Sequence, residues 1–295
     1  MRFEYIHSKA EAAETALYCR LFKVTPQGYK KHIASMTKPY KYAALLADIK
    51  AVITENEFNR TYGKQRMYEE LQLNKSCRYS YNTVAKVMRM NGLLKKPNGP
   101  KGLTKTDKQA QKSDNLLKRD FTASAPNQKT VTDIKEWAGL DGKVYASGMF
   151  DCYDNMCLGL VLSDNMQAEI VEQTFRQAAG MHPLRGAIAH SDRGSQYTSD
   201  LVRGTLQRLG IVQSMNGAAG RCHDNAKCES MWGRGESEIS AIYNTCKLTC
   251  EELKRLLFRY YMGYWNNQRI CSAIGGMPPA LKRAAYYENQ AVRAA

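Results

Sequence analysis

The spacing of apolar residues in the first part of the chain predicts short helices. Five apolar residues mark a helix near residues 41–57: Leu45, Leu46, Ile49, Val52 and Ile53. A second helix is expected over residues 62–71, and a third should be capped by Ser80 or Asn82 and end at Asn91-Gly92. Two short helices joined by a turn fit a helix-turn-helix arrangement. A plain helical bundle with a basic face fits the same pattern.

Residues 95–128 have the composition of a basic linker. They contain few apolar side chains and several Pro, Gly and Lys residues, so little core can form there. The expected organisation is a basic helical DNA-binding region over residues 1–94, this linker, and a folded domain over residues 129–295. The basic residues of the linker would lie along a DNA backbone.

From residue 129 onward, short β-prone runs appear. Four strands are expected, with a hairpin at Asp141-Gly142: Thr130–Ile134, Lys143–Asp151, Cys157–Leu162 and Gly186–His190. Helical patterns alternate with the later strands. Three strands followed by alternating helix and strand indicate a mixed α/β sheet covered on both faces.

Local signals also set the expected helices of this domain. Asp164 is expected to cap one helix, which Gly180 would end, and another helix is expected near residues 199–209. Asn225 is expected to begin the helix that carries Glu229. These assignments rest on capping residues and helical periodicity alone.

The last predicted helix starts at a capping-box spacing. Thr249 and Glu252 stand three residues apart. Six large residues then repeat at helical spacing: Leu253, Leu256, Leu257, Tyr260, Tyr261 and Tyr264. Core packing is the favoured interpretation of this aromatic stripe, and a base-stacking platform is the alternative.

Charge is distributed unevenly along the chain. The formal net charge is +15, with 43 Lys and Arg against 28 Asp and Glu. Residues 1–120 hold 24 basic and 11 acidic residues, whereas residues 121–295 hold 19 and 17. The first part therefore favours a polyanion such as nucleic acid over a merely solubilising surface or a membrane surface.

Other sequence features argue against membrane and metal-thiolate classes. No apolar run approaches the roughly 18 residues that a membrane span needs, and the first residues do not resemble a signal peptide. A cytoplasmic, nucleoid-associated protein is expected. The nine cysteines are scattered, and Cys222, His223 and Cys228 do not repeat in the paired spacing of a zinc site, so ordinary reduced thiols are favoured.

Three carboxylates stand out as candidates for chemistry. Asp133 lies in a β-prone run, Asp192 just after another, and Glu229 in a predicted helix. Three acids from separate elements suit hard divalent cations, because Mg²⁺ prefers oxygen ligands. Two such ions can hold both sides of a phosphodiester during in-line displacement. Each acid taken alone would be better explained as a surface group or helix cap.

These segments resemble a known family. The chain is similar over nearly its whole length to the second-frame (OrfB) proteins of the IS-three-like group of bacterial insertion sequences, which are DDE transposases with an integrase core. The resemblance rests on Tyr62-Gly63-Lys64-Gln65-Arg66, Thr132-Asp133-Ile134, residues 190–199 from His190 to Ser199, Asp224-Asn225-Ala226 with Glu229-Ser230, and Tyr264 to Arg269 with Gly276 to Ala280. Together they are far more specific than any one motif.

The resemblance implies an RNase H-like fold and DNA strand cleavage and strand transfer. It implies that Asp133, Asp192 and Glu229 are both catalytic residues and ligands of two Mg²⁺ ions, with Mn²⁺ as the alternative metal. Asp133 would bridge both ions, and each of the other two acids would hold one side. It also implies element-end and target DNA as partners, a first-frame protein as partner or fusion, and a homo-oligomer on DNA.

The chain departs from the family's pattern at several positions. Thr130 stands where the group usually has Trp, and Lys135 where it has a hydroxyl residue. Glu236 replaces a basic residue that contacts DNA, and it would repel a phosphate unless Arg234 compensates. Gly235 should weaken the same helix. The interval between Asp192 and Glu229 is 36 residues, one more than usual, and the extra residue is assigned to the loop at residues 216–221.

Weaker functional assignments surround the three acids. His190 and Asn225 are candidate supporting residues, with a packed strand-end histidine and a helix cap as the alternatives; Asp224 is a further cap candidate. Asp151 and Asp154 are expected in surface or turn roles. The candidate DNA-binding residues are Lys64, Arg66, Lys86, Arg89, Arg193 and Arg234.

Two other function classes remain open at this point. One is a hydrolytic nuclease with the same metal centre and no strand transfer. The other is a catalytically impaired DNA-binding remnant or regulator, which Thr130 and Glu236 favour. The products formed from DNA separate the three classes.

Overall fold

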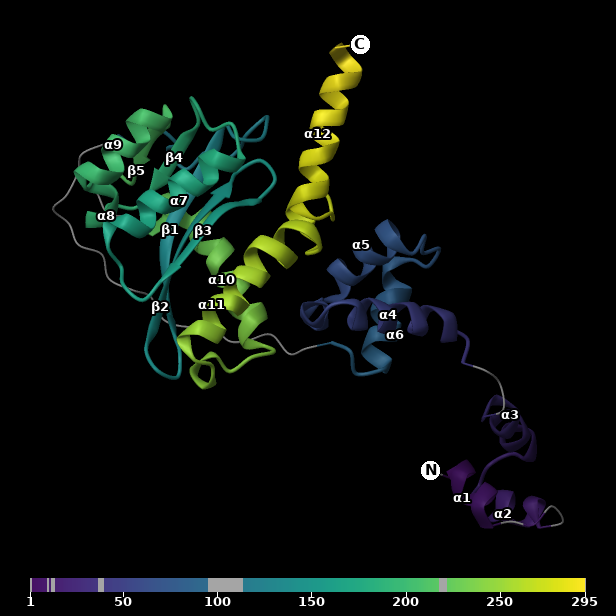
Figure 1. Cartoon of the computed structure of the whole chain (residues 1–295). Helices are drawn as coiled ribbons and strands as arrows, with labels where there is room; N and C mark the ends of the chain where they lie inside the picture. The colour runs from purple at the N-terminus through teal and green to yellow at the C-terminus, as the bar shows by residue number, and fades with distance from the viewer. Residues whose placement is uncertain are drawn as a thin grey trace. The chain divides into compact units, whose positions relative to one another are not determined.

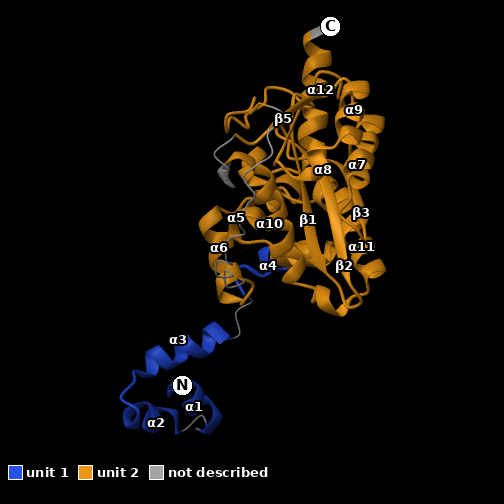
Figure 2. Ribbon diagram, turned by 90° about the vertical axis from the view of Figure 1, so that its left-hand side faces the viewer, with its two compact units in different colours: residues 1–48 blue, residues 49–295 orange. Residues whose placement is uncertain are grey.

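The computed structural model describes residues 2–9, 11, 14–36, 40–94, 114–217 and 222–294 (Figure 1). The chain divides into two compact units, residues 1–48 and 49–295 (Figure 2). The first unit holds three helices that the sequence pattern did not predict, α1 (Arg2–Lys9), α2 (Thr15–Leu21) and α3 (Pro26–Met36). Their small core is formed by Ile6, Cys19 and Tyr29.

The predicted helices of the basic region are confirmed. They are α4 (Ala43–Glu55), α5 (Lys64–Asn74) and α6 (Tyr81–Met90). Ser80, not Asn82, caps α6, because its side chain accepts a hydrogen bond from the Thr83 backbone N–H. Gly92 adopts a φ of +67° just beyond the helix, a conformation that suits glycine and stops the helix. Within the described residues, no helix is both long enough and apolar enough to cross a bilayer.

A five-stranded mixed sheet forms the centre of the second unit. Its strands are β1 (Lys129–Ala138), β2 (Lys143–Asp151), β3 (Cys157–Ser163), β4 (Ile188–Ser191) and β5 (Val212–Met215). Their order is β3-β2-β1-β4-β5. The first three strands pair antiparallel, whereas β4 pairs parallel with β1 and β5. The predicted mixed sheet is thus confirmed, and β1 extends four residues beyond the run expected from the sequence.

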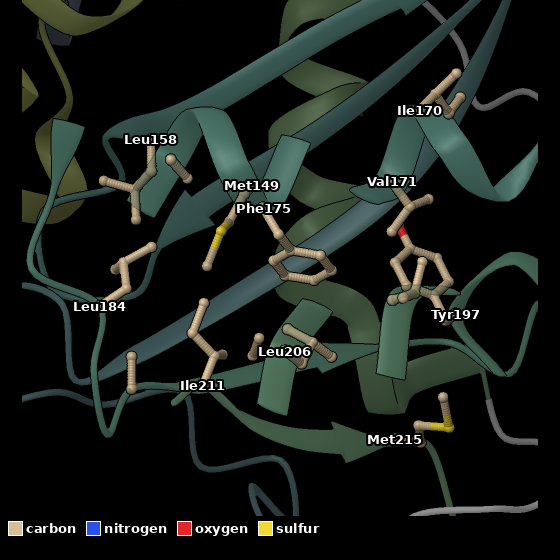
Figure 3. Packing of buried hydrophobic residues seen from close by; sticks show 14 residues of the cluster. Met149, Leu158, Ile170, Val171, Phe175, Leu184, Tyr197, Leu206, Ile211 and Met215 are labelled. Carbon is tan, nitrogen blue, oxygen red and sulfur yellow. The ribbon is translucent and has the colours of Figure 1, made fainter. Parts of the chain in front are cut away.

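Helices cover both faces of the sheet. On one face, α7 (Ala168–Met181) and α9 (Asp200–Leu209) enclose the main hydrophobic core; α8 (Ser195–Thr198) leads into α9. Figure 3 shows Met149 of β2, Phe175 of α7 and Leu206 of α9 meeting in this core. The neighbouring Gly148 faces the other side and lies against Trp232 of α10 (Ala226–Ser240). This alternation is the two-residue period of a strand buried on both faces.

Two helix-end predictions were wrong. Gln167, not Asp164, is the residue before α7. The Asp164 carboxylate instead pairs with Lys254 Nζ at 2.9 Å. Gly180 lies inside the last turn of α7, and the helix ends one residue later.

The C-terminal part is helical and strongly aromatic. The capping box of Thr249 and Glu252 is confirmed at the start of α11 (Cys250–Phe258). The chain continues without interruption through a π-helical segment, Arg259–Trp265, whose aromatic residues are buried. The aromatic stripe therefore packs in the core, as favoured from the sequence. A last helix, α12 (Pro279–Ala294), was not predicted.

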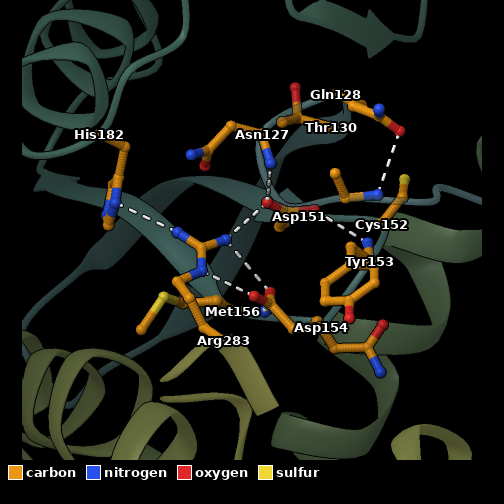
Figure 4. Close-up of polar contacts among 12 residues, drawn as sticks. Asn127, Gln128, Thr130, Asp151, Cys152, Tyr153, Asp154, Met156, His182 and Arg283 are labelled. Carbon is orange, nitrogen blue, oxygen red and sulfur yellow. Dashed lines mark hydrogen bonds and ion pairs between the residues drawn. The ribbon is translucent and has the colours of Figure 1, made fainter. Parts of the chain in front are cut away.

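A buried ion cluster connects α12 to the sheet (Figure 4). Arg283 donates from Nε to Asp154 at 2.6 Å and from Nη2 to Asp151 at 2.5 Å. Both carboxylates are completely buried, so the expected surface role was wrong; the turn role is confirmed, because they accept hydrogen bonds from the backbone N–H groups of Tyr153 and Met156. The backbone N–H of Asn127 also donates to Asp151, at 2.7 Å. One guanidinium is shared by two carboxylates, and burial, followed by the charge of Asp154, raises the pKa of Asp151 to about 6.

Candidate active site

The first two candidate acids lie on adjacent parallel strands. Asp133 is on β1, opposite Gly148 of β2. Asp192 follows the last residue of β4, and the register of the two strands pairs Val131 with His190. Continuing that register by two residues brings Asp133 beside Asp192. The central strands of the sheet therefore position both side chains.

The third acid comes from α10, which packs on the face of the sheet opposite the main hydrophobic core. Glu229 is exposed in the first turn of α10. The start of α10 is tied to β1, because Asn225 Nδ2 donates to the Thr132 carbonyl at 3.3 Å. This contact joins the residue before α10 to the residue before Asp133.

Electrostatics show that the three acids interact. Burial, and then the negative charge of Asp192, raise the pKa of Asp133 to about 7. This value also includes a smaller raising by the charge of Glu229 and a lowering by the Ile134 backbone N–H and by Lys135. Because the negative charges of these acids repel one another, a cation bound among them would be stabilised.

The donor chemistry fits a hard divalent cation. Three carboxylates provide only oxygen ligands, which Mg²⁺ and Mn²⁺ prefer. Among the described residues, however, no group of three or more His, Cys, Asp or Glu side chains is placed so that it could hold an ion.

The structure places His190 in the packed role that was its alternative. Its side chain is fully buried. Nδ1 contacts Ser214 Oγ at 2.8 Å, and Nε2 contacts the Asp224 carbonyl at 3.0 Å. The carbonyl can only accept, so Nε2 carries the proton. Burial lowers the pKa of this imidazole, which therefore remains neutral and connects β4 to β5 and to the start of α10.

Asn225 and Asp224 also fix the start of α10, but neither caps it through its side chain. No side chain caps this helix. Asn225 is buried, and its Oδ1 atom has no hydrogen-bond partner among the described residues. Asp224 accepts from Arg119 Nε at 2.8 Å and from the Gly217 backbone N–H at 3.0 Å. Residues 218–221, which hold most of the loop assigned the extra residue, lie outside the described part.

The predicted DNA-binding residues fall into three groups. Lys86 and Arg89 are exposed on α6. Lys64, Arg66 and Arg234 line one cleft, although Arg66 also pairs with Glu238 at 2.7 Å. Arg193 is half-buried, and its Nε donates to the Asn216 carbonyl at 2.7 Å.

Comparison with known proteins identifies two domains in this chain. An integrase core domain matches residues 123–222, and a helix-turn-helix-like (HTH-like) domain matches residues 41–101. The transposase for insertion sequence element IS904 of Lactococcus lactis is 32% identical over 233 residues, which cover 78% of this chain and 90% of that protein.

The chain belongs to the IS3 family of insertion-sequence transposases. A second relative, the transposase InsF for insertion sequence IS3A of Escherichia coli, is 27% identical over 95% of this chain and 97% of its own length. The solved catalytic core domain of HTLV-2 integrase, in complex with magnesium, covers 55% of this chain and 99% of that chain, at 13% identity and a TM-score of 0.40. The predicted integrase-type, RNase H-like fold with a preceding helix-turn-helix-like domain is confirmed.

Two residues of this transposase that depart from the family's pattern, Lys135 and Glu236, form an ion pair with each other. Lys135 Nζ lies 3.0 Å from Glu236 Oε2. The expectation that Arg234 would have to neutralise Glu236 therefore needs correction, because Lys135 does so. Thr130, the third departure, is buried in β1 and donates to the Ile188 carbonyl of β4 at 3.1 Å. The sequence alone did not reveal this charge pair, because its members lie on different elements.

The glycines of α10 give a matched pair of stability predictions. A Cβ atom at Gly235 would lie 2.0 Å from the Tyr261 hydroxyl oxygen, whereas at Gly233 it would meet nothing within 4 Å. Gly235→Ala is therefore expected to lower the free energy of unfolding by about 1–3 kcal/mol through overpacking. Gly233→Ala should raise it by up to about 1 kcal/mol, because alanine favours helix. Urea unfolding of both variants measures the contrast, and equal effects would contradict it.

Proposed function

We propose that this transposase cuts and joins DNA strands at a site formed by Asp133, Asp192 and Glu229. One observation carries the proposal: β1, the end of β4 and the first turn of α10 bring these three acids into one electrostatic environment. Their contexts in the sequence match the family's three catalytic acids. A shared negative environment of this kind is typical of a metal-dependent phosphoryl-transfer site.

The chain's own residues hold the acids in place. The backbone of β1 fixes Asp133 at the centre of the sheet. The Gly194 N–H donates to Asp192 Oδ1 at 2.9 Å, and Asn225 ties the start of α10 to β1. When bound, Mg²⁺ or Mn²⁺, expected as two ions, would activate the attacking oxygen and stabilise the leaving oxygen. This scheme needs no covalent bond between the protein and DNA.

DNA recognition is assigned to the helix-turn-helix-like part. The exposed residues Lys86 and Arg89 on α6 are suited to contact the element ends. We also propose target DNA, a first-frame partner and a second copy of this chain as partners. We also propose that the protein acts in the cytoplasm, on the nucleoid.

The division into residues 1–94, 95–128 and 129–295 is part of the same proposal. Residues 95–113 of the expected linker lie outside the described part of the chain. Its described remainder contacts the sheet: the Leu116 N–H donates to Ser214 Oγ at 2.9 Å, and Leu117 is buried. The linker would therefore reach the catalytic domain before β1 begins.

Product analysis tests this function. Wild-type protein, its first-frame partner, labelled element-end DNA and a target plasmid are incubated with Mg²⁺. Joined DNA molecules are the expected product, and EDTA should abolish them. Nicked DNA without joined products would indicate a nuclease, and DNA binding without any cleavage would indicate a regulator; either result would contradict the proposal.

A further inference from the structure

A cleft of about 900 Å³ lies between α10 and the residues that begin α5. Both walls belong to the second compact unit. On the α10 side, the lining residues Ser230, Gly233, Arg234 and Ser237 recur at three- and four-residue spacing, which places them on one helix face. Three of these four residues are small, so the helix backbone is accessible along this wall.

The charges in the cleft favour an anion. Among the described residues, its lining includes four cations, Lys64, Arg66, Arg234 and Arg269, and one acid, Glu238. Glu238 is buried and pairs with Arg269 and Arg66, each at 2.7 Å. The cleft therefore keeps a net positive charge even after these ion pairs are counted.

Two cations remain available on opposite walls. Lys64 opens α5 and Arg234 lies on α10; both are exposed, and among the described residues neither has an ion-pair partner. No side chain caps the start of α5, so its first N–H groups add partial positive charge on the same wall as Lys64. An elongated polyanion that passes between the walls would meet both cations.

The position of the cleft indicates which anion it takes. Ser230 directly follows the candidate catalytic residue Glu229, while the other wall belongs to the HTH-like domain. The cleft thus spans from the catalytic helix to the recognition domain. We propose that it holds the phosphate backbone of the DNA strand that runs between the recognised sequence and the scissile phosphate. This inference rests on the proposed function and adds the path of the DNA.

The salt dependence of DNA binding tests the cleft. Each phosphate contact contributes about −0.9 to the slope of log K against log salt for duplex DNA. We therefore expect Lys64→Gln and Arg234→Gln each to reduce the magnitude of the slope by about 1, and the double variant by about 2. The full chain is measured with a duplex of about 30 base pairs. Arg176→Gln is the control, because this side chain is 70% exposed on α7, on the opposite face of the sheet, and it should leave the slope unchanged.

A second duplex of unrelated sequence and a joining assay complete the test. Phosphate contacts do not read sequence, so the cleft variants should weaken binding to both duplexes equally. Unchanged slopes in both variants, or weakening confined to one duplex, would overturn the cleft assignment. If wild-type protein still joins DNA in that case, the proposed function stands without the cleft. If wild-type protein shows no salt-dependent binding, both proposals fail.

Discussion

Asp192→Asn is expected to abolish strand cleavage and joining while DNA binding is retained. The substitution keeps the shape of the side chain but removes a negative charge from a site where Asp133 and Glu229 provide the other two. Loss of a charged group that stabilises the transition state should reduce the rate by on the order of 10³-fold, about 4 kcal/mol. Single-turnover cleavage at saturating DNA measures this loss without a contribution from binding.

Asp200→Asn is the matched control for this prediction. It makes the same chemical change, but the Asp200 side chain is 97% exposed at the start of α9. Its cleavage rate should equal that of wild type. If Asp192→Asn cleaves at the control's rate with the same DNA occupancy, Asp192 is not a catalytic residue.

Glu238→Gln is expected to cause the largest loss of stability. Glu238 is buried and accepts hydrogen bonds from Arg269, Arg66 and the Tyr260 hydroxyl, the last at 2.8 Å. The substitution would leave the Arg269 guanidinium buried without its counter-ion. Breaking a buried pair in this way costs about 3–5 kcal/mol. The loss is measured as a change in the urea midpoint at constant m-value.

The pH dependence of this loss gives a second readout. Burial alone raises the pKa of Glu238, but Arg269, Arg66 and Tyr260 together hold it below its ordinary value of 4.5. A carboxylate with a lowered pKa stabilises the fold above that ordinary value, and the stabilisation is lost as the pH falls through the folded-state pKa. The difference between wild type and Glu238→Gln should therefore be full at pH 7 and shrink below about pH 4.5.

Glu236→Gln, two residues away, is the control for Glu238→Gln. Glu236 pairs with Lys135, but both side chains are about one-third exposed. Glu236→Gln should therefore change stability by no more than about 1 kcal/mol. A similar loss in both variants would show that the buried network does not stabilise the fold as proposed.

Local patterns predicted most elements of the catalytic domain. Strand alternation and the Asp141-Gly142 turn located β1 and β2, because these signals depend on neighbouring residues only. Helix α12 was missed; most of its residues are exposed, and its buried Arg283 is held by carboxylates far away in the sequence. The error at Asp164 has a tertiary cause: its carboxylate pairs with Lys254, 90 positions away, instead of capping α7.

The candidate site was also predictable from the sequence only where its signals are local. Asp133, Asp192 and Glu229 could be selected from the sequence because each lies in a distinctive local motif. The ion pairs of the same domain could not. Arg283 reaches Asp151 across 132 positions, and Lys135 meets Glu236 only because α10 packs on β1. Which charges pair depends on how distant elements pack, and periodicity contains no information about that.

The most direct test of the central claim is to measure Mn²⁺ binding by electron paramagnetic resonance in wild type and in Asp133→Asn, Asp192→Asn and Glu229→Gln, with Asp200→Asn as control. If the three acids form one metal site, wild type and the control should bind Mn²⁺ equally, and each of the three variants should bind it far more weakly. Undiminished Mn²⁺ binding by all three variants would contradict the account, because the metal would then be held elsewhere or not at all.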